Sequence, residues 1–397
     1  MTARLKSLGQ VTVDDEGRPL RYPSALFFDQ RKKELYLINV GASSVVIYGS
    51  DYFPVASMGA GRGIEGPRGG FLASNDLIYV CQSRTKDKPP RITVLNAALF
   101  PLRDIPIAES PDSAEFVPRQ VAVSRDGLLY VVGESNRGVL VLDEDGVVLR
   151  KLKPMDLVAA EALAPAGKAT AGAAKRKGSG PTASGESGGS GEAPKEGKDS
   201  RVDIPEEFRP QTTQEQARAG KKVMGPVRIR ALTIDKAGRI YLVSAETGKV
   251  YVYGPDESFL FSFGKKGGSP GTLSTPSGVA VDEDRGLVYV VDYMRHTVLG
   301  YDLSGNLQLE FGGRGTGEGW FNYPADIAVI QGGQVVVADQ FNNRAQALEV
   351  EPILYEVPSI GVSKTAEPSA EAEDGSGSEP PEKEPGAEGT DEVESKE

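Results

Sequence analysis

A pair of short apolar strands recurs six times along this chain, and this repeat constrains the fold more than any other feature. The period is roughly 40 to 50 residues, and two further short strands follow each pair. Four strands in a unit of this length are typical of a β-propeller blade, so six units predict an all-β ring of six antiparallel four-stranded blades. The valine- and tyrosine-rich strands of the six pairs are Glu34–Asn39, Leu77–Gln82, Leu128–Gly133, Arg239–Ser244, Leu287–Asp292 and Gln334–Asp339.

The strand repeat is interrupted once and ends before the last residues of the chain. Between the third and fourth units the sequence turns to Ala, Gly, Ser, Pro, Lys and Glu, which bury too little apolar area to offset the entropy of ordering. We therefore expect blades one to three over 1–154, a disordered insert over 155–225, blades four to six over 226–362 and a disordered acidic tail over 363–397. The insert should leave the ring on the face that carries the inter-blade loops.

Two segments compete to complete the last blade. Arg4–Gly9, near the start of the chain, resembles the fourth strands of other units, and Ile353–Val357 follows the sixth unit directly. Either strand would close the ring and cover an edge that could otherwise pair with another chain. The pattern favours the N-terminal segment without deciding between them.

Charge and composition limit the partners. The formal net charge is −11, and the segment 363–397 accounts for −9 of it, which leaves −2 for the rest of the chain. A nearly neutral body does not predict a nucleic-acid partner. Neither an apolar run of membrane-spanning length nor a signal-peptide pattern is present, so we expect no membrane span. The expected location is the cytoplasm if the first residue is native, or the periplasm or exterior if a signal peptide is missing.

Several patterns that suggest catalysis lack the context that catalysis needs. Gly61–Gly66 reads G-x-G-x-x-G, but no helix is predicted after it, so we expect no dinucleotide cofactor. His296 is the single histidine, which argues against a zinc site. Cys81 is the single cysteine and lies in a predicted strand, so it should be a buried apolar residue. Asn322, Asp326 and Glu318 could offer oxygen ligands to Ca²⁺ in the channel, but they are a weak set, and we expect no metal.

The ends of the last two blades resemble the NHL repeat. Lys265–Val281 and Gly312–Val329 each read as a Gly-rich loop, a bulky residue, a proline and an apolar strand. Asp292–Asp302 and Asp339–Glu349 then follow with matched spacing. The resemblance covers all six units, is strongest in the last two, and is closest to bacterial members. It implies a six-bladed propeller but not a function, because NHL proteins include enzymes, RNA binders and protein-interaction scaffolds.

Individual motif residues follow from the resemblance. Asp339 and Arg344 stand at the NHL Asp and Arg positions, where they are expected to support a loop, with a ligand role as the alternative. Lys249 takes the Arg position in the fourth blade, and His296 stands where NHL blades often have His or Asn. The loop before the last blade carries three aromatic residues, and they are expected either to wedge between blades or to anchor a partner: Trp320, Phe321 and Tyr323.

These observations predict a non-enzymatic NHL-type scaffold that mediates protein–protein interaction. No residue is assigned a catalytic role and no cofactor is expected. The alternative is a Ca²⁺-dependent propeller hydrolase, lactonase or lyase, and a second alternative is RNA binding. Oligomeric state stays open. The candidate binding residues are Trp320, Phe321, Tyr323, Arg344, Lys249 and His296.

Overall fold

The computed structural model describes residues 3–107, 116–134, 136–159, 163 and 222–352. These ranges contain 26 β-strands and three short 3-10 helices, η1 (Val40–Ala42), η2 (Ala60–Arg62) and η5 (Gln340–Asn342). None of the helices in the described ranges has the length and apolar character needed to cross a membrane. Most of the predicted insert and the whole acidic tail lie outside the described residues.

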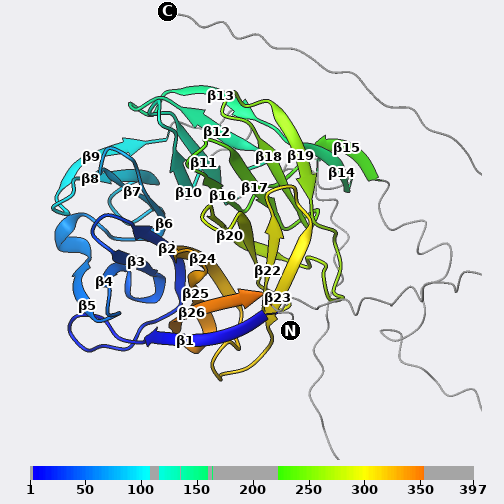
Figure 1. The fold of residues 1–397 in the computed structure, drawn as a ribbon. Coiled ribbons are helices and arrows are strands. Elements are labelled where there is room, and N and C mark those ends of the chain that lie inside the picture. Colours follow the sequence, from blue (N-terminus) through cyan, green and yellow to red (C-terminus); the bar gives the residue numbers. More distant parts are fainter. Residues whose placement is uncertain (1–2, 108–115, 135, 160–162, 164–221, 353–397) are drawn as a thin grey trace, which may run out of the picture. The chain divides into compact units, whose positions relative to one another are not determined.

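The strands form six four-stranded antiparallel blades, as the repeat predicted. The first strand of each blade contacts the first strands of its two neighbours, so that six strands surround a central channel (Figure 1). Blade 1 contains β2 (Pro23–Asp29), β3 (Glu34–Asn39), β4 (Ser44–Tyr48) and β5 (Pro54–Met58). Blade 2 contains β6 (Pro67–Leu72), β7 (Ile78–Gln82), β8 (Arg91–Leu95) and β9 (Pro101–Pro106).

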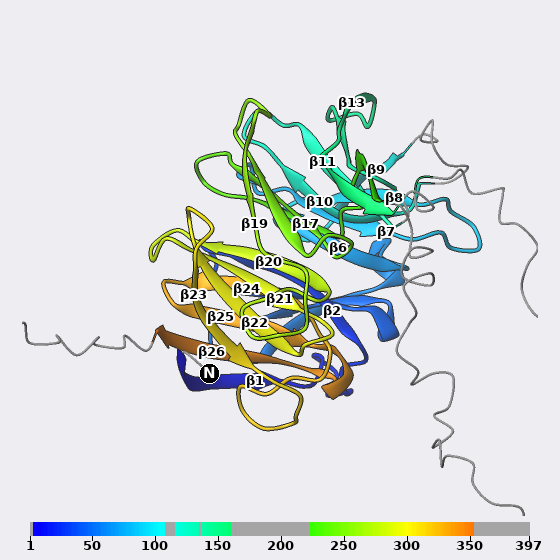
Figure 2. The same ribbon diagram turned by 90° about the vertical axis from the view of Figure 1, so that its right-hand side faces the viewer.

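The remaining four blades complete the ring in chain order. Blade 3 contains β10 (Pro118–Val123), β11 (Leu129–Gly133), β12 (Val139–Leu142) and β13 (Val148–Leu152). Blade 4 contains β16 (Ala231–Ile234), β17 (Ile240–Ser244), β18 (Lys249–Tyr253) and β19 (Phe259–Phe263). Blade 5 contains β20 (Pro276–Asp282), β21 (Leu287–Asp292), β22 (Thr297–Asp302) and β23 (Leu307–Gly312), which Figure 2 shows from the side.

Blade 6 joins the two ends of the described chain. It contains β24 (Pro324–Gln331), β25 (Gln334–Asp339) and β26 (Arg344–Pro352), and its fourth strand is β1 (Ala3–Val11). β1 pairs antiparallel with β26 from Ala3 opposite Pro352 to Val11 opposite Ala345 (Figure 1). Of the two segments considered from the sequence, the N-terminal one occupies this position; Ile353–Val357 lies outside the described residues.

A proline opens the first strand in five blades and sets a β-bulge there. The register between first and second strands shifts directly after Pro23, Pro67, Pro118, Pro276 and Pro324. Proline cannot donate to the ladder, so it is tolerated at a strand start or a bulge. A bulge turns the extra residue out of the regular alternation and re-aims its side chain.

The hydrophobic core lies between blades rather than within them. Six clusters of buried residues occupy the six interfaces between neighbouring blades. Each of the first five second strands contributes one buried tyrosine, namely Tyr36, Tyr79, Tyr130, Tyr241 and Tyr289. Cys81 is also fully buried, and burial raises the pKa of its thiol. Both faces of the middle strands are therefore apolar, which explains their continuous runs of valine and leucine.

A hairpin marks the place where the insert leaves the ring. β14 (Met155–Ala159) pairs antiparallel with β15 (Lys222–Pro226), although the sequence placed both segments in the disordered insert. Val158 packs into the core between blades 3 and 4, and Asp156 accepts hydrogen bonds from Lys249 and Tyr251 of blade 4. These contacts to the ring order the two ends of the insert, although its composition alone predicts no ordered strands there.

Candidate functional site

The central channel opens on two different faces. On the loop face lie the connections between blades and the loops between second and third strands. On the turn face lie the turns between first and second strands. The two mouths differ in their charged groups: those that line the turn-face mouth have partners, whereas two arginines at the loop-face mouth have no carboxylate partner among the described residues.

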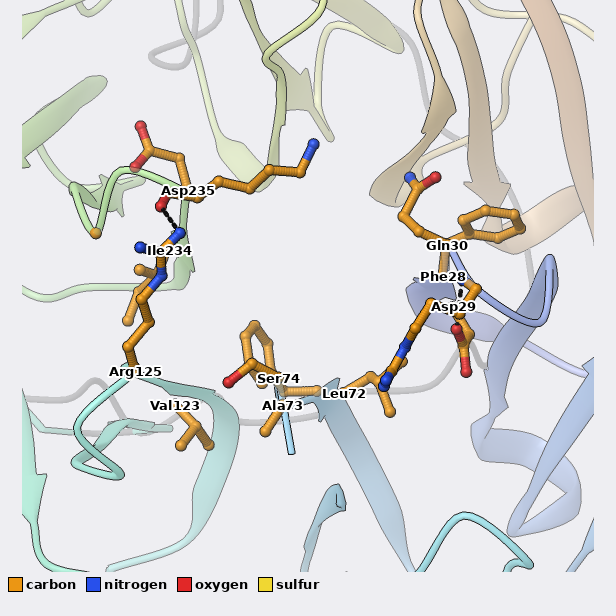
Figure 3. A pocket seen from close by; sticks show the side chains of 14 residues that line it. Phe28, Asp29, Gln30, Leu72, Ala73, Ser74, Val123, Arg125, Ile234 and Asp235 are labelled. Atoms are coloured by element: carbon orange, nitrogen blue, oxygen red, sulfur yellow. Dashed lines mark hydrogen bonds between the residues drawn. The ribbon is translucent and has the colours of Figure 1, made fainter. Parts of the chain in front are cut away.

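The turn-face mouth is a cavity of about 470 Å³ (Figure 3). Asp29 and Asp235 line it and accept backbone N–H groups of their own turns. Arg125 donates to the carbonyl of Lys236, and the Lys236 ammonium lies 3.1 Å from Glu283. The charged groups that surround this cavity are thus used within the turns.

Three arginines occupy one repeated position on the loop face. Arg68 and Arg119 are the bulged residues after Pro67 and Pro118, and Arg230 precedes β16 at the matching position of blade 4. Blades 1, 5 and 6 carry Ser24, Ser277 and Ala325 there. We call Arg68, Arg119 and Arg230 the basic arc. It gives one half of the channel mouth a positive charge.

Two members of the basic arc, Arg119 and Arg230, border a cavity of about 530 Å³ between blades 3 and 4. Its lining includes Arg119, Arg230 and the Arg137–Glu246 pair, which is bidentate with both distances 2.9 Å. Glu134 also lines it and lies 3.6 Å from Arg68. These two glutamates therefore already face other arginines.

Arg119 and Arg230 lack a carboxylate partner among the described residues. Arg119 donates its Nε–H to the carbonyl of Arg230 at 3.2 Å, and the Nε of Arg230 is buried without an acceptor in the described part of the chain. Burial, reinforced by the charge of Arg230, lowers the pKa of Arg119 to about 10. Burial lowers the pKa of Arg230 as well. Each shift means that the folded ring disfavours the positive charge at this position.

The other half of the mouth is aromatic. Tyr22, Phe341, Tyr323 and Tyr293 form a chain of ring contacts, with centroids 5.6, 5.1 and 5.0 Å apart in that order. We call these four residues the aromatic arc. They come from blades 1, 6 and 5, and Tyr22 and Phe341 are about half exposed. The arcs meet where the guanidinium of Arg230 lies 5.9 Å from the ring centroid of Tyr293.

Two residues of the aromatic arc have strained backbones. Tyr22 and Tyr323 directly precede the prolines of blades 1 and 6, and their φ angles are 52° and 54°. A residue with a Cβ avoids this left-handed region, which glycine adopts freely. Strain of this kind persists where the surrounding structure over-determines it and is frequent at binding sites.

The aromatic residues predicted from the WFNYP loop separate in the structure. Phe321 is fully buried between blades 5 and 6, with its ring centroid 6.3 Å from that of Phe311, so it acts as a wedge. Trp320 is 44% exposed and lies on the Gly-rich loop, where a Cβ on Gly313 would come within 2.6 Å of its ring. Tyr323 belongs to the aromatic arc. Only Trp320 and Tyr323 of these three offer surface to a partner.

Arg344 holds a loop in place. Its Nε donates to Asp339 at 2.8 Å, and its terminal nitrogen donates to the carbonyls of Gly317 and Trp320. Asp339 also accepts the N–H of Asn322 at 2.6 Å. The last residue of the second strand supports a loop in blade 1 as well, because Asn39 at the end of β3 accepts the N–H of Arg21.

His296 and Lys249 support neighbouring segments. His296 is buried, and its Nδ1 accepts the backbone N–H of Tyr323 at 2.9 Å, so it helps to position this residue of the aromatic arc. Burial lowers the pKa of His296, assisted by the charge of Arg314. Lys249 forms an ion pair with Asp156 at 2.8 Å and thereby anchors the hairpin β14–β15. The structure does not bring Lys249 to the channel mouth.

The three oxygen ligands considered for Ca²⁺ do not converge. Glu318 is exposed, and the buried side-chain oxygen of Asn322 finds no hydrogen-bond partner among the described residues. Asp326 lies in the channel, where it accepts the N–H of Leu26 at 3.0 Å. Within the described ranges, no three acidic, histidine or cysteine residues form a group that could hold a metal ion.

The basic arc was missed in the sequence because arginines scattered over 160 residues look like solvated surface charges. Once the blades are aligned on their prolines, Arg68 and Arg119 fall in one column, and Arg230 joins it despite the missing proline in blade 4. The repeat register was the available signal. It could not show that two of the three arginines lack an acidic neighbour.

Comparisons with known proteins agree with the fold. A model of the NHL repeat matches residues 273–301 and 321–345. A protein of unknown function from Bacteroides thetaiotaomicron is 14% identical with a TM-score of 0.55, over 88% of this chain and 76% of that chain. Streptogramin B lyase is 10% identical with a TM-score of 0.50, over 88% of this chain and 98% of that chain. Identities this low show the fold alone. No curated protein sequence matches this chain.

Proposed function

Since the chain is an NHL-repeat six-bladed β-propeller, we propose that it is a non-enzymatic scaffold that binds a protein partner at the loop-face mouth. The observation that carries this proposal is the aromatic arc, a continuous row of rings from three blades on a rigid ring. Aromatic residues and arginine are the side chains most often found at the energetic centre of protein interfaces.

The exposure of the arc supports a partner rather than a purely structural role. Tyr22 is 49% exposed and Phe341 46%, and their rings are in contact. Large apolar side chains exposed side by side are unusual on a protein that has no partner. The half-exposed Trp320 adds a further anchor on the same loop face.

The enzymatic alternative has less support. A channel metal would need convergent oxygen ligands, and the described residues offer Asp326 with its carboxylate engaged by Leu26. RNA binding is also less favoured, because the rings of the aromatic arc pack on one another at angles of 41° to 73°, so their faces are not free for stacked bases.

The test is partner capture with a matched pair of variants. The full chain, immobilised as bait, is exposed to lysate of the native host, and bound proteins are quantified by mass spectrometry. Phe341→Ala, which removes a ring from the arc, should reduce the recovered partner at least fivefold. Phe53→Ala removes a ring that is 71% exposed on the turn face and should leave recovery unchanged.

Recovery of the same partner in equal amount with both variants would place its binding site elsewhere. A bait that enriches no protein above background would remove the scaffold function itself. Melting curves by circular dichroism establish that both variants are folded before the comparison is made.

A further inference from the structure

The ring pairs its partly buried arginines with carboxylates almost everywhere. Such pairs occur at the ends of second strands, in turns and between neighbouring blades: Arg91–Asp104, Arg137–Glu246, Arg239–Asp235, Arg295–Glu310 and Arg344–Asp339. Arg119 and Arg230 depart from this pattern, because no ion pair joins either of them to a described residue. A guanidinium that is desolvated without an anion costs free energy in the folded state.

The geometry directs the two guanidiniums toward one space. Arg119 is held by its Nε–H on the carbonyl of Arg230, which leaves its two terminal nitrogens for another acceptor. Both side chains line the cavity of about 530 Å³ between blades 3 and 4. The planar fork of a guanidinium matches the two oxygens of a carboxylate.

Apolar surface begins directly beside these charges. Arg230 lies over the ring of Tyr293, and from there the aromatic arc runs to the half-exposed Phe341 and Tyr22. A ligand that reaches from the cavity along the mouth would therefore meet two positive charges first and aromatic rings next.

We propose that the mouth recognises an acidic peptide segment of the partner, with a carboxylate seated between Arg119 and Arg230 and an apolar side chain further along the segment on Phe341 and Tyr22. This inference rests on the proposed function and specifies the chemistry of the partner. The carboxylate supplies a counter-charge that the described residues lack at this position, and the apolar side chain covers the exposed rings.

A peptide fits this surface better than a nucleic acid. The two arginines are enough to hold a single carboxylate, whereas successive phosphates need a continuous basic track. Such a track would have to cross the aromatic arc, whose four residues carry no positive charge.

Fluorescence anisotropy with the full chain tests the proposal. The probe is a fluorescein-labelled octapeptide of alternating glutamate and phenylalanine; a second probe has glutamine for every glutamate, and a third has alanine for every phenylalanine. The first probe should bind at least tenfold more tightly than either of the others. The double variant Arg119→Gln, Arg230→Gln should weaken its binding at least tenfold.

The matched control is Lys6→Gln with Arg103→Gln, which removes two positive charges from exposed outer strands and should leave binding of the first probe unchanged. If the double variant at the mouth does not fold, Arg119→Lys replaces it, since lysine keeps the charge but loses the fork; it too should weaken binding.

Three results would overturn the inference. They are equal binding of the glutamate and glutamine probes, unchanged binding by the mouth variant, and tighter arginine-dependent binding of a uridine octanucleotide than of the first probe. Partner capture that depends on Phe341 but not on Arg119 would leave the proposed scaffold function intact and refute only the acidic character of the ligand.

Discussion

Asp326 offers the sharpest test of how the ring is closed. This residue of β24 lies fully buried in the channel, and its carboxylate accepts the N–H of Leu26 in the first strand of blade 1 at 3.0 Å. Gln120 makes the same kind of contact from blade 3 to Leu232 of blade 4. Each side chain accepts a backbone N–H from the first strand of the next blade. The hydrogen bond of Asp326 joins blade 6 to blade 1, which are the last and first blades of the ring.

Burial raises the pKa of Asp326 to about 7, although the N–H groups of Leu26 and Ile327 and the charge of Arg119 oppose the shift. The folded chain therefore holds one more proton than the unfolded chain between about pH 4 and 7, and stability falls as the pH rises through that window. At about 1.4 kcal/mol per pH unit, Asp326 should lower the free energy of unfolding by roughly 2.5 kcal/mol between pH 5 and pH 8.

Asp326→Asn keeps an oxygen acceptor for Leu26 and removes the titration. Urea unfolding followed by far-UV circular dichroism should show the variant gaining roughly 2.5 kcal/mol relative to wild type from pH 5 to pH 8. Asp145→Asn, at an exposed turn, should show no such change. A difference between Asp326→Asn and wild type that stays constant across this range would refute the reasoning, because it would mean that Asp326 ionises as readily in the folded as in the unfolded chain.

Three further predictions concern residues around the mouth. Neutral His296 accepts the N–H of Tyr323, and burial lowers its pKa, so the unfolded chain binds the proton more readily than the folded chain. The same urea titrations should therefore show wild type losing stability relative to His296→Asn as the pH falls below about 6.5. Because the φ of Tyr22 is 52°, Tyr22→Gly should be about 1 kcal/mol more stable than Tyr22→Ala; equal stability would show that the backbone is not strained there. Phe321→Ala should cost roughly 3 to 5 kcal/mol by opening the interface between blades 5 and 6, and a loss below 1 kcal/mol would contradict its role as a wedge.

The six-bladed fold follows from the repeat because each blade is a local unit. Hairpin turns and short apolar strands recur within each stretch of about 40 residues, with a leading proline in five of the six, so periodicity alone identifies the elements. The loop-supporting pair Asp339 and Arg344 was accessible for the same reason, since its two members are five residues apart and face each other across one loop.

The hairpin β14–β15 was not accessible from composition. Its strands are separated by 62 residues of the chain, and their sequences are short and partly polar. What orders them is contact with the ring: Val158 in the core of blades 3 and 4, and Asp156 with Lys249 and Tyr251. The secondary-structure propensity of a short segment does not depend on such tertiary contacts, so it could not predict them.

The amino-acid sequence by itself determined the number of blades, the order of the strands in the first five blades and the column in which Arg68, Arg119 and Arg230 stand. Only the tertiary structure decided that Arg119 and Arg230 share a cavity without a carboxylate, and that four aromatic residues from three blades touch one another beside it. The reason is that the repeat specifies contacts within a blade, whereas the loop-face mouth is formed by residues of several different blades. Distances there depend on how the ring closes, which is set by packing at all six interfaces together.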